Sequence, residues 1–518
     1  MSEYESFDFD VLVIGAGITG AGIARDASMR GLQVALVDAR DFAAGTSSRS
    51  TKLVHGGIRY LAQGDVGLVR EAATERATVR RIAPHLATPI PFIVATHSRA
   101  ALAKFRAGLW AYEKLGGVAA DDRHEVWDAQ ELAAHEPLIR IDGINGAVVY
   151  TEYLTDDARL TVANVRDAAA HGAVVANYAA VTGFERQGGR ATGAQVADTL
   201  TEGRNVAVRA RTIVNAAGPW ADRLIRLEDD AAPRRLQLTE GIHIVVPLSK
   251  LPIRRTLVMS APDGRGVFAI PRKSCVYIGT TDTFYADAAY WPELRAEDVQ
   301  YLLRTTNAAY RVSTLDIGDI TSAWSGLRPL VAEAGKAPSE ISRKDETNVG
   351  PLGMITISGG KLTAYRRMAE RVVDLCVRTL GVDARPVATA DAPLPGGAEG
   401  NVSAIAGGLR RQGATEDVAT RLANLYGTEA ASVLALGADA AAEAEWAVRS
   451  EGAVQLEDWW VRRSARAWFD ADGGVAALMP AAQRMATLLG WSEATRQAQI
   501  DACVRQRRAT MASLGAVT

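Results

Sequence analysis

The chain contains a strand–helix–strand pattern near residue 10. An apolar run over residues 9–14 (FDVLVI) is followed by three spaced glycines and by a segment with helical spacing that ends at Gly31. A second apolar run over residues 33–37 closes on Asp38. Two apolar runs joined by a helix within about 30 residues are typical of a βαβ unit with parallel strands. This part of the chain is therefore predicted to form an α/β domain.

Later segments extend the pattern and then change it. We predict helices over residues 156–172 and 362–380, and strands over residues 173–181 and 353–358. Residues 211–218 are predicted to form a strand that runs into a turn of small residues. Between residues 237 and 283 four short runs (GIHIVVPL, TLVMSA, GVFAIP and CVYIGTTD) predict an antiparallel sheet. The prolines and glycines of residues 386–400 indicate a linker, and the chain from about residue 401 has helical patterns alone.

These patterns predict a mixed α/β and α+β protein with three domains. A Rossmann-like nucleotide-binding domain is expected from residues 1–85, 150–236 and 320–385. A β-rich substrate or cap domain is expected from residues 86–149 and 237–319, and a C-terminal helical domain from residues 395–518.

Composition excludes several classes of protein. With 518 residues, 48% hydrophobic and 23% charged, the chain is typical of a globular protein. A net charge of −2 argues against nucleic-acid binding. The widely spaced Cys275, Cys376 and Cys503 favour a reducing compartment, and the histidines show no metal-ligand spacing. Because no apolar run approaches the ~20 residues that span a bilayer, we expect a cytoplasmic protein, free or held at the inner face of the membrane.

The first glycines have the spacing of a dinucleotide site. Gly15 permits a tight turn, Gly17 lets the backbone approach a diphosphate, and Gly20 lets the helix pack on the strand. Asp38 lies where a carboxylate can accept hydrogen bonds from ribose hydroxyls. A second turn, Ala216–Gly218 in TIVNAAGPWAD, follows a strand and favours FAD over NAD, because the combination resembles the FAD-binding half of glutathione-reductase-type flavoproteins.

Three further motifs extend this resemblance. They are GTSSRSTKLVHGGIRYL from Gly45, SGLRPL from Ser325 and GGKLTAYR from Gly359. With YLTDDARL, NAAGPWAD, GIHIVVP and IGTTDT, they make residues 8–370 resemble the FAD-dependent glycerol-3-phosphate dehydrogenases, members of the D-amino-acid-oxidase-like flavoproteins.

The resemblance implies a set of cofactor contacts and a substrate. Expected at the FAD are Gly15, Ala16, Gly17, Ile18, Thr19, Gly20, Asp38, Ala39, Arg40, Thr46, Ser47, Ser48, Lys52, Leu53, His55, Val181, Ala217, Gly218, Trp220, Gly360, Leu362 and Thr363. The expected substrate is sn-glycerol 3-phosphate, whose phosphate carries nearly two negative charges and calls for fixed cations.

The resemblance also implies which side chains act on the substrate. Arg59, Arg328 and Lys361 are expected near the phosphate, with Tyr60 on the pocket wall and the turn at residues 279–282 beside it. His243 and His55 are both candidates for the base; we rank His243 as the acid/base or hydroxyl binder and place His55 beside the flavin ring. Arg59, Arg328, Lys361 and His243 are thus the catalytic candidates.

The electron acceptor remains open. The dehydrogenases of the family pass electrons to a membrane quinone, whereas its oxidases use oxygen and form hydrogen peroxide; the lack of a long central insertion favours the dehydrogenase. Residues 99–114 (RAALAKFRAGLWAYEK) suit either a membrane interface or an amphipathic helix packed on the core. The tryptophans of residues 459–468 are expected in the core. A homodimer is one candidate assembly, and rival functions are oxidation of amino acids or amines and a non-catalytic flavin protein.

Overall fold

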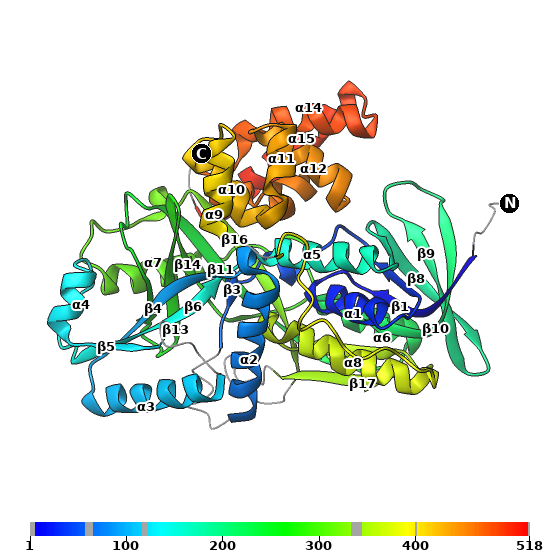
Figure 1. The fold of residues 1–518 in the computed structure, drawn as a ribbon, viewed down its shortest axis with the longest axis horizontal. Helices are drawn as coiled ribbons and strands as arrows, with labels where there is room; N and C mark the ends of the chain where they lie inside the picture. The colour runs from blue at the N-terminus through cyan, green and yellow to red at the C-terminus, as the bar shows by residue number, and fades with distance from the viewer. Residues whose placement is uncertain (1–5, 57–65, 117–122, 333–343, 399–400, 516–518) are drawn as a thin grey trace.

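The computed structural model describes residues 6–56, 66–116, 123–332, 344–398 and 401–515. Two sheets lie at opposite ends of the molecule, and the C-terminal helices sit above their junction (Figure 1). This arrangement confirms the mixed α/β architecture with a helical C-terminal region.

The first sheet contains the predicted βαβ unit. Its main strand order is β17-β18-β10-β1-β2-β7, with β8 and β9 continuing from β10. Strand β1 pairs in parallel with both β2 and β10. The strands are β1 (Ser6–Ile14), β2 (Val34–Val37), β7 (Val174–Ala176), β8 (Ala179–Gln187), β9 (Arg190–Asp198), β10 (Asn205–Asn215), β17 (Asp345–Val349) and β18 (Ile355–Gly359).

Three helices cover one face of this sheet and share its core. They are α1 (Ile18–Met29), α5 (Asp157–Ala170) and α8 (Tyr365–Leu380). All three follow the helices predicted from sequence. The short α6 (Ala221–Glu228) follows β10. Parallel strands buried under helices explain why β1 and β2 have continuous apolar runs.

One predicted strand is corrected. Residues 173–181 form two strands, because β7 ends at Ala176 and β8 begins at Ala179. Between them Tyr178 has a positive φ of 55°, and its N–H donates to the carbonyl of Arg40. This turn lets β7 pair with β2 while β8 pairs with β9.

The second sheet contains the predicted antiparallel runs. Its main order is β15-β11-β14-β13-β12-β4-β6-β3, with β16 on β11 and β5 on β6. The pairs β11–β14, β12–β13 and β13–β14 are antiparallel, as predicted. The strands are β3 (Leu53–Val54), β4 (Thr88–Thr96), β5 (Glu125–Trp127), β6 (Gly146–Leu154), β11 (Leu236–Pro247), β12 (Thr256–Ser260), β13 (Gly266–Arg272), β14 (Cys275–Gly279), β15 (Thr283–Tyr285) and β16 (Ser322–Val331).

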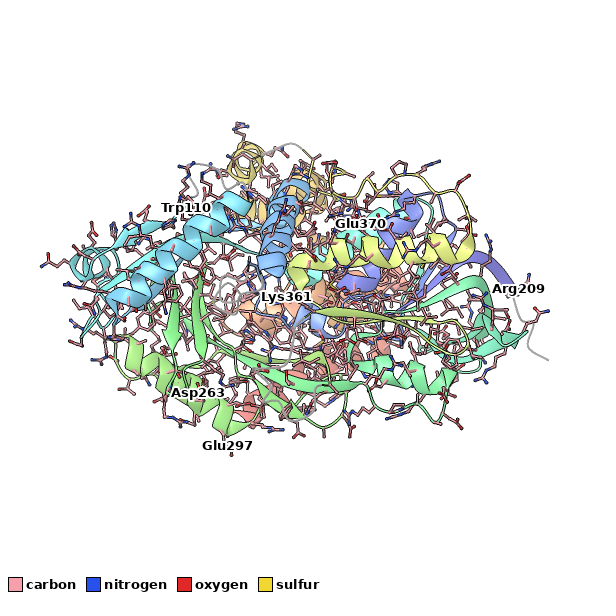
Figure 2. All side chains as sticks on the ribbon, turned by 90° about the horizontal axis from the view of Figure 1, so that it is seen from below. Trp110, Arg209, Asp263, Glu297, Lys361 and Glu370 are labelled. Carbon is pink, nitrogen blue, oxygen red and sulfur yellow. The ribbon has the colours of Figure 1, made fainter. Side chains whose placement is uncertain are left out.

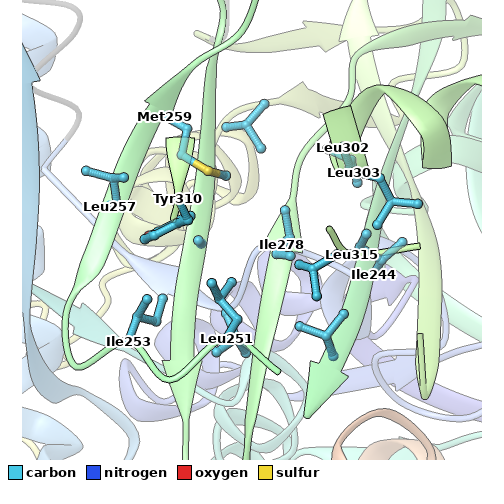
Figure 3. Close-up of a cluster of buried hydrophobic side chains, with 14 of the residues drawn as sticks. Ile244, Leu251, Ile253, Leu257, Met259, Ile278, Leu302, Leu303, Tyr310 and Leu315 are labelled. Carbon is cyan, nitrogen blue, oxygen red and sulfur yellow. The ribbon is translucent and has the colours of Figure 1, made fainter. Parts of the chain in front are cut away.

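Helix α7 (Ala296–Ala309) packs on this sheet through a core of aliphatic side chains that includes Ile244, Ile278 and Leu302 (Figure 3). Strands β3 and β16 belong to this sheet, although the sequence assigned their residues to the cofactor domain. The domain boundaries stay a prediction. Arg328, on β16, is held by the second sheet.

The C-terminal region forms a helical domain, and its core is continuous with the second sheet. Buried Trp459, Trp460 and Trp468 pack in one cluster with Tyr277 and Trp324 of the sheet, which confirms their predicted core position. The helices are α9 (Val402–Arg411), α10 (Glu416–Tyr426), α11 (Ala430–Leu436), α12 (Ala440–Glu451), the π-helix η9 (Asp458–Arg463), α13 (Arg466–Phe469), α14 (Val475–Leu489) and α15 (Glu493–Ser513).

Helices α2 (Val66–Ile82), α3 (Arg99–Gly116) and α4 (Ala129–His135) complete the fold. Helix α3 contains residues 99–114, for which an amphipathic helix was predicted. Within the described part of the chain, no helix combines the length and the apolar character needed to cross a bilayer.

Candidate functional site

A cavity of about 880 Å³ opens where the first sheet meets the C-terminal helices. Its walls come from the N-terminus of α1, the end of β2, the loop at Gly45, the end of β10 and the turn after β18. Because α1 begins at the cavity, the positive end of its dipole favours a negatively charged group there.

The glycines at the start of α1 lie so close to neighbouring atoms that a side chain at these positions would collide with them or crowd them. Gly15 has a φ of +104°, and a Cβ there would lie 2.6 Å from the carbonyl oxygen of Ala216. A Cβ at Gly20 would lie 1.8 Å from the carbonyl oxygen of Gly15. A Cβ at Gly17 would lie 3.1 Å from Ser47 Oγ, which accepts a hydrogen bond from the N–H of Ile18. Gly15 and Gly20 therefore let neighbouring backbone segments pack closely, and Gly17 exposes its backbone on the cavity wall.

Asp38 stands at the end of β2, on the cavity wall. Its carboxylate accepts hydrogen bonds from the N–H of Ala16 at 2.7 Å and from the N–H of Arg40 at 2.9 Å. Burial raises the pKa of Asp38 to about 6, and these two backbone donors oppose the shift. The bonds fix the carboxylate beside the N-terminus of α1.

Small residues form another part of the cavity wall. Gly359 and Gly360 both have positive φ and precede Lys361, which lies near the centre of the molecule in Figure 2. A Cβ at Gly45 would lie 2.9 Å from the ring of Trp220. The chain there passes too close to the indole for a larger residue.

His55 and Thr363 connect two of the predicted motifs. The N–H of His55 donates to Thr363 Oγ1 at 3.2 Å, and the Thr363 hydroxyl donates to the carbonyl of His55 at 3.1 Å. The LVHGG and GGKLTAYR motifs, about 300 residues apart, therefore lie side by side.

Arg328 is held by the turn after β14. Its Nη2 donates to Thr280 Oγ1 at 2.8 Å and to the carbonyl of Thr281 at 3.1 Å, and its Nη1 lies 3.2 Å from the carboxylate of Asp282. A Cβ at Gly241, on the neighbouring strand, would lie 2.1 Å from this guanidinium. The GTTD motif thus positions the arginine.

His243 lies on β11 beside the same turn. A Cβ at Gly279 would lie 2.2 Å from the imidazole, whose ring stacks on Trp324 at 4.8 Å. Its Nε2 is 3.0 Å from Thr51 Oγ1. Burial lowers the pKa of His243 well below its usual value, and the charges of Arg328 and Lys52 lower it further. The imidazole is therefore held in its neutral form at pH 7.

Many of the predicted cofactor residues line the cavity. They are Gly15, Gly17, Ile18, Thr19, Asp38, Ala39, Arg40, Thr46, Ser47, Val181, Ala217, Gly218, Trp220, Gly360 and Leu362, with Lys361. The residues that do not line it are Ala16, Gly20, Ser48, Lys52, Leu53, His55 and Thr363, with His243 and Arg328, although Pro329, next to Arg328, does. Arg59 and Tyr60 lie outside the described residues.

Lys52 has a structural environment in the protein. Its ammonium is buried, 2.6 Å from the carboxylate of Asp157, and donates to the carbonyl of Ser48 at 2.8 Å. This ion pair ties the loop after η1 (Thr46–Ser48) to the start of α5. A direct contact of Lys52 with the cofactor stays a prediction.

Several residues at the site carried no sequence signal. Thr51 bonds to His243, and Tyr290, Gln455, Glu457, Gln499 and Cys503 line the cavity. Tyr290 lies in the loop between β15 and α7, which carries no motif. Gln455 and Glu457 come from the segment before η9, and Gln499 and Cys503 from α15. The spacing of these residues along the chain follows neither a helical nor a strand period, so the sequence does not predict that they meet at one cavity.

The donor set and the shape of the cavity fit FAD. The open backbone at Gly17 and the N-terminus of α1 suit a diphosphate, and the oriented carboxylate of Asp38 suits a ribose. Asp38 follows β2 and the glycine turn before Lys361 follows β18, with β1 and β10 between these strands, and both border the same cavity, which suits an extended dinucleotide.

Comparison with known proteins agrees with this reading of the site. Residues 10–366 match the family described as FAD dependent oxidoreductase, and residues 387–496 match the C-terminal domain of alpha-glycerophosphate oxidase. The aerobic glycerol-3-phosphate dehydrogenase of Bacillus subtilis is 41% identical over 89% of this chain and 88% of that protein. The Staphylococcus aureus protein of the same name is 38% identical over 95% of this chain and 93% of its own length.

A solved structure shows the same fold. The X-ray structure of the glycerol-3-phosphate dehydrogenase from Bacillus halodurans, complexed with FAD, aligns with a TM-score of 0.83 and 33% identity. The alignment covers 99% of this chain and 97% of that chain. FAD is the cofactor, and the chain belongs to the family of FAD-dependent glycerol-3-phosphate dehydrogenases.

Proposed function

We propose that this chain oxidises sn-glycerol 3-phosphate to dihydroxyacetone phosphate and passes the electrons to a membrane quinone. The observation that carries the proposal is the meeting of Arg328 and His243 at one turn, residues 279–282, in a chain 41% identical to an aerobic glycerol-3-phosphate dehydrogenase. A cation and a neutral base side by side suit a phosphorylated alcohol.

The cations are assigned to the substrate phosphate. Arg328 is fixed by Thr280, Thr281 and Asp282, so that little side-chain freedom is lost on binding. Lys361, from the glycine turn, supplies a second charge on the cavity wall. Arg59 and Tyr60, which lie outside the described residues, are kept as the third cation and its neighbour from the sequence prediction alone. A doubly charged phosphate needs more than the single arginine that a carboxylate needs, which favours this substrate over an amino acid.

His243 is assigned the proton of the substrate C2 hydroxyl. Its lowered pKa keeps the imidazole neutral, and Thr51 at Nε2 orients the ring. FAD, when bound, would accept at its N5 atom the hydride that leaves the substrate C2. The C2–H and O–H bonds break, the carbonyl forms, and the hydroxyl proton passes by way of His243 to water. His55 is assigned to the side of the flavin ring.

The cofactor is placed with its diphosphate on α1, its ribose at Asp38 and its ring system toward Lys361. The residues predicted for FAD from sequence are retained in this proposal. Those that do not line the cavity are assigned a supporting role, in which they hold the lining residues in place. The observation in favour is that the α1 N-terminus and Asp38 share one wall.

A panel of substrates tests the assignment. Reduction of an artificial electron acceptor is measured with glycerol 3-phosphate, glycine, sarcosine and D-alanine. The proposal expects turnover with glycerol 3-phosphate, and preference for any of the three amino acids would contradict it.

The acceptor is tested separately, because the C-terminal region matches a domain named for an oxidase. Photoreduced enzyme is reoxidised with oxygen, with a quinone analogue under nitrogen, and with both. Fast reoxidation that requires the quinone supports the dehydrogenase, whereas rapid peroxide formation without quinone supports the oxidase.

Use of a quinone requires contact with the membrane, and α3 is the proposed contact. Trp110 is 58% exposed, Lys114 lies 5.3 Å from its ring centre, and Lys104 and Arg106 are exposed on the same helix. Leu109 is buried and holds the helix on the protein. Figure 2 shows Trp110 at the periphery of the molecule. A basic helix with an exposed tryptophan suits the anionic inner face of the cytoplasmic membrane.

Sedimentation with lipid vesicles tests this contact. We expect the protein to bind vesicles that contain phosphatidylglycerol and to bind less after Trp110→Ser. The matched control is Trp446→Phe, in the helical domain. Equal binding by the Trp110→Ser variant and the wild type would remove α3 from the proposal.

A further inference from the structure

The C-terminal helical domain supplies part of the cavity wall. Five of its residues line the cavity: Gln455, Glu457, Gln499, Ala502 and Cys503. They come from the segment before η9 and from α15. The cavity is therefore shared between the cofactor sheet and a domain joined to it through a linker.

Hydrogen bonds show which end of the cavity these residues occupy. Asp458 accepts a hydrogen bond from the hydroxyl of Tyr178 at 2.6 Å. Tyr178 in turn bonds through its backbone to Arg40, two residues after Asp38, and its carbonyl accepts from Thr199. The helical domain therefore contacts the end of the cavity that holds Asp38.

A second set of contacts reaches the same place from the other sheet. The Arg40 guanidinium lies 4.0 Å from the ring centre of Tyr290. The Tyr290 hydroxyl bonds to Glu457 and accepts from Arg462 at 2.8 Å. Tyr290 thus contacts both the Arg40 guanidinium and the Glu457 carboxylate. Three separate parts of the chain therefore surround one end of the cavity.

The side chains of this wall are themselves fixed. Gln499 accepts a hydrogen bond from the N–H of Leu456 at 3.0 Å and donates to Gln455. Amides held in this way present donors and acceptors to the cavity at little entropic cost, which is what recognition of a polar heterocycle or a sugar requires.

We infer that the C-terminal domain completes the binding site for the adenosine half of FAD, so that the cofactor is held between two domains. Because FAD would contact both, its binding stabilises the docking of the helical domain, and the docked domain tightens the binding of FAD by the same coupling free energy. The inference rests on the cofactor orientation proposed above.

A pair of tryptophan variants on α15 tests the wall. Ala502 lines the cavity, whereas Ala498, one helical turn earlier, is exposed and does not belong to the wall. The holoenzyme is diluted and the release of FAD is followed by the fluorescence of the filtrate. We expect Ala502→Trp to release FAD about tenfold faster or more, because bulk added to a filled site must displace it, and Ala498→Trp to behave as the wild type.

Hydrogen exchange of the full-length protein gives a second measurement that needs no variant. Segments 452–463 and 495–506 are expected to exchange more slowly with FAD than without it. Wild-type release from the Ala502→Trp variant, or equal exchange of both segments in the two states, would overturn the inference. If Gly17→Val still abolishes FAD retention in that case, the proposed cofactor orientation is supported, and only the proposed role of the helical domain is contradicted.

Discussion

Arg463 donates two hydrogen bonds to the carboxylate of Asp41, at 2.6 and 2.8 Å, although the two residues are 422 positions apart. Both side chains are buried, and Asp41 also bonds to Arg462. Asp41 lies three residues after Asp38. The same loop therefore carries the carboxylate at the cavity and the carboxylate that docks the helical domain.

Removal of Arg463 should loosen this docking. In Arg463→Leu, the buried network loses one positive charge, and breaking a buried ion pair costs about 3–5 kcal/mol. We expect calorimetry to show that the helical domain unfolds at a lower temperature than in the wild type. Arg449→Leu is the control, because its pair with Glu445 is exposed at the arginine and is worth about 1 kcal/mol or less. Equal losses in the two variants would contradict a docking role.

Gly17→Val should abolish retention of FAD. Gly17 has an ordinary φ of −71°, so the substitution acts through the space at the cavity and not through backbone strain. A side chain there meets Ser47 and covers the N-terminus of α1. The ratio of bound flavin to protein after gel filtration is the measurement, with Gly407→Val on α9 as the control. A Gly17→Val variant with a full complement of flavin would refute the placement of the diphosphate.

Arg328→Ala should impair catalysis without loss of the yellow flavin. A hydrogen bond to a charged group contributes about 1.5–3 kcal/mol, so kcat/KM for glycerol 3-phosphate should fall by about 10- to 100-fold. Arg304→Ala, at an exposed position of α7, controls for loss of positive charge. Unchanged kinetics in the Arg328→Ala variant would remove that arginine from the substrate site.

The His243 imidazole should remain neutral below pH 6.5. Burial and the charges of Arg328 and Lys52 lower its pKa, so the folded protein takes up this proton at a lower pH than the unfolded chain does. The linked contribution to stability is therefore present above pH 6.5 and is lost as the pH falls toward the pKa of the folded state. Side-chain ¹⁵N NMR, assigned with a His243→Asn spectrum, measures the pKa directly. A midpoint at or above 6.5 would exclude the buried environment described here.

Local patterns made much of the fold predictable. The glycines at residues 15–20 and the apolar runs around them specify β1, α1 and β2, because each feature depends on neighbours within about 30 residues. The antiparallel runs around Tyr277 were equally clear. The turn at Tyr178 was missed, since a positive φ at a tyrosine has no sequence signature.

Site residues could be predicted where a local motif determines their position. They could not be predicted where the site is formed by segments far apart in the sequence. Asp38 follows from its place at the end of β2. The ion pair of Lys52 depends on Asp157, 105 residues later, and could not be read from either motif. The approach of Gln455 and Gln499 to the cavity depends on the docking of a whole domain, which the network at Asp41 fixes through long-range contacts.

The most direct test of the account is the visible spectrum of the holoenzyme under nitrogen, before and after glycerol 3-phosphate is added. We predict that the flavin absorption near the visible maximum bleaches with glycerol 3-phosphate and is unchanged with glycerol or inorganic phosphate. A flavin that stays oxidised with glycerol 3-phosphate, in protein that binds FAD fully, would contradict the proposed reaction.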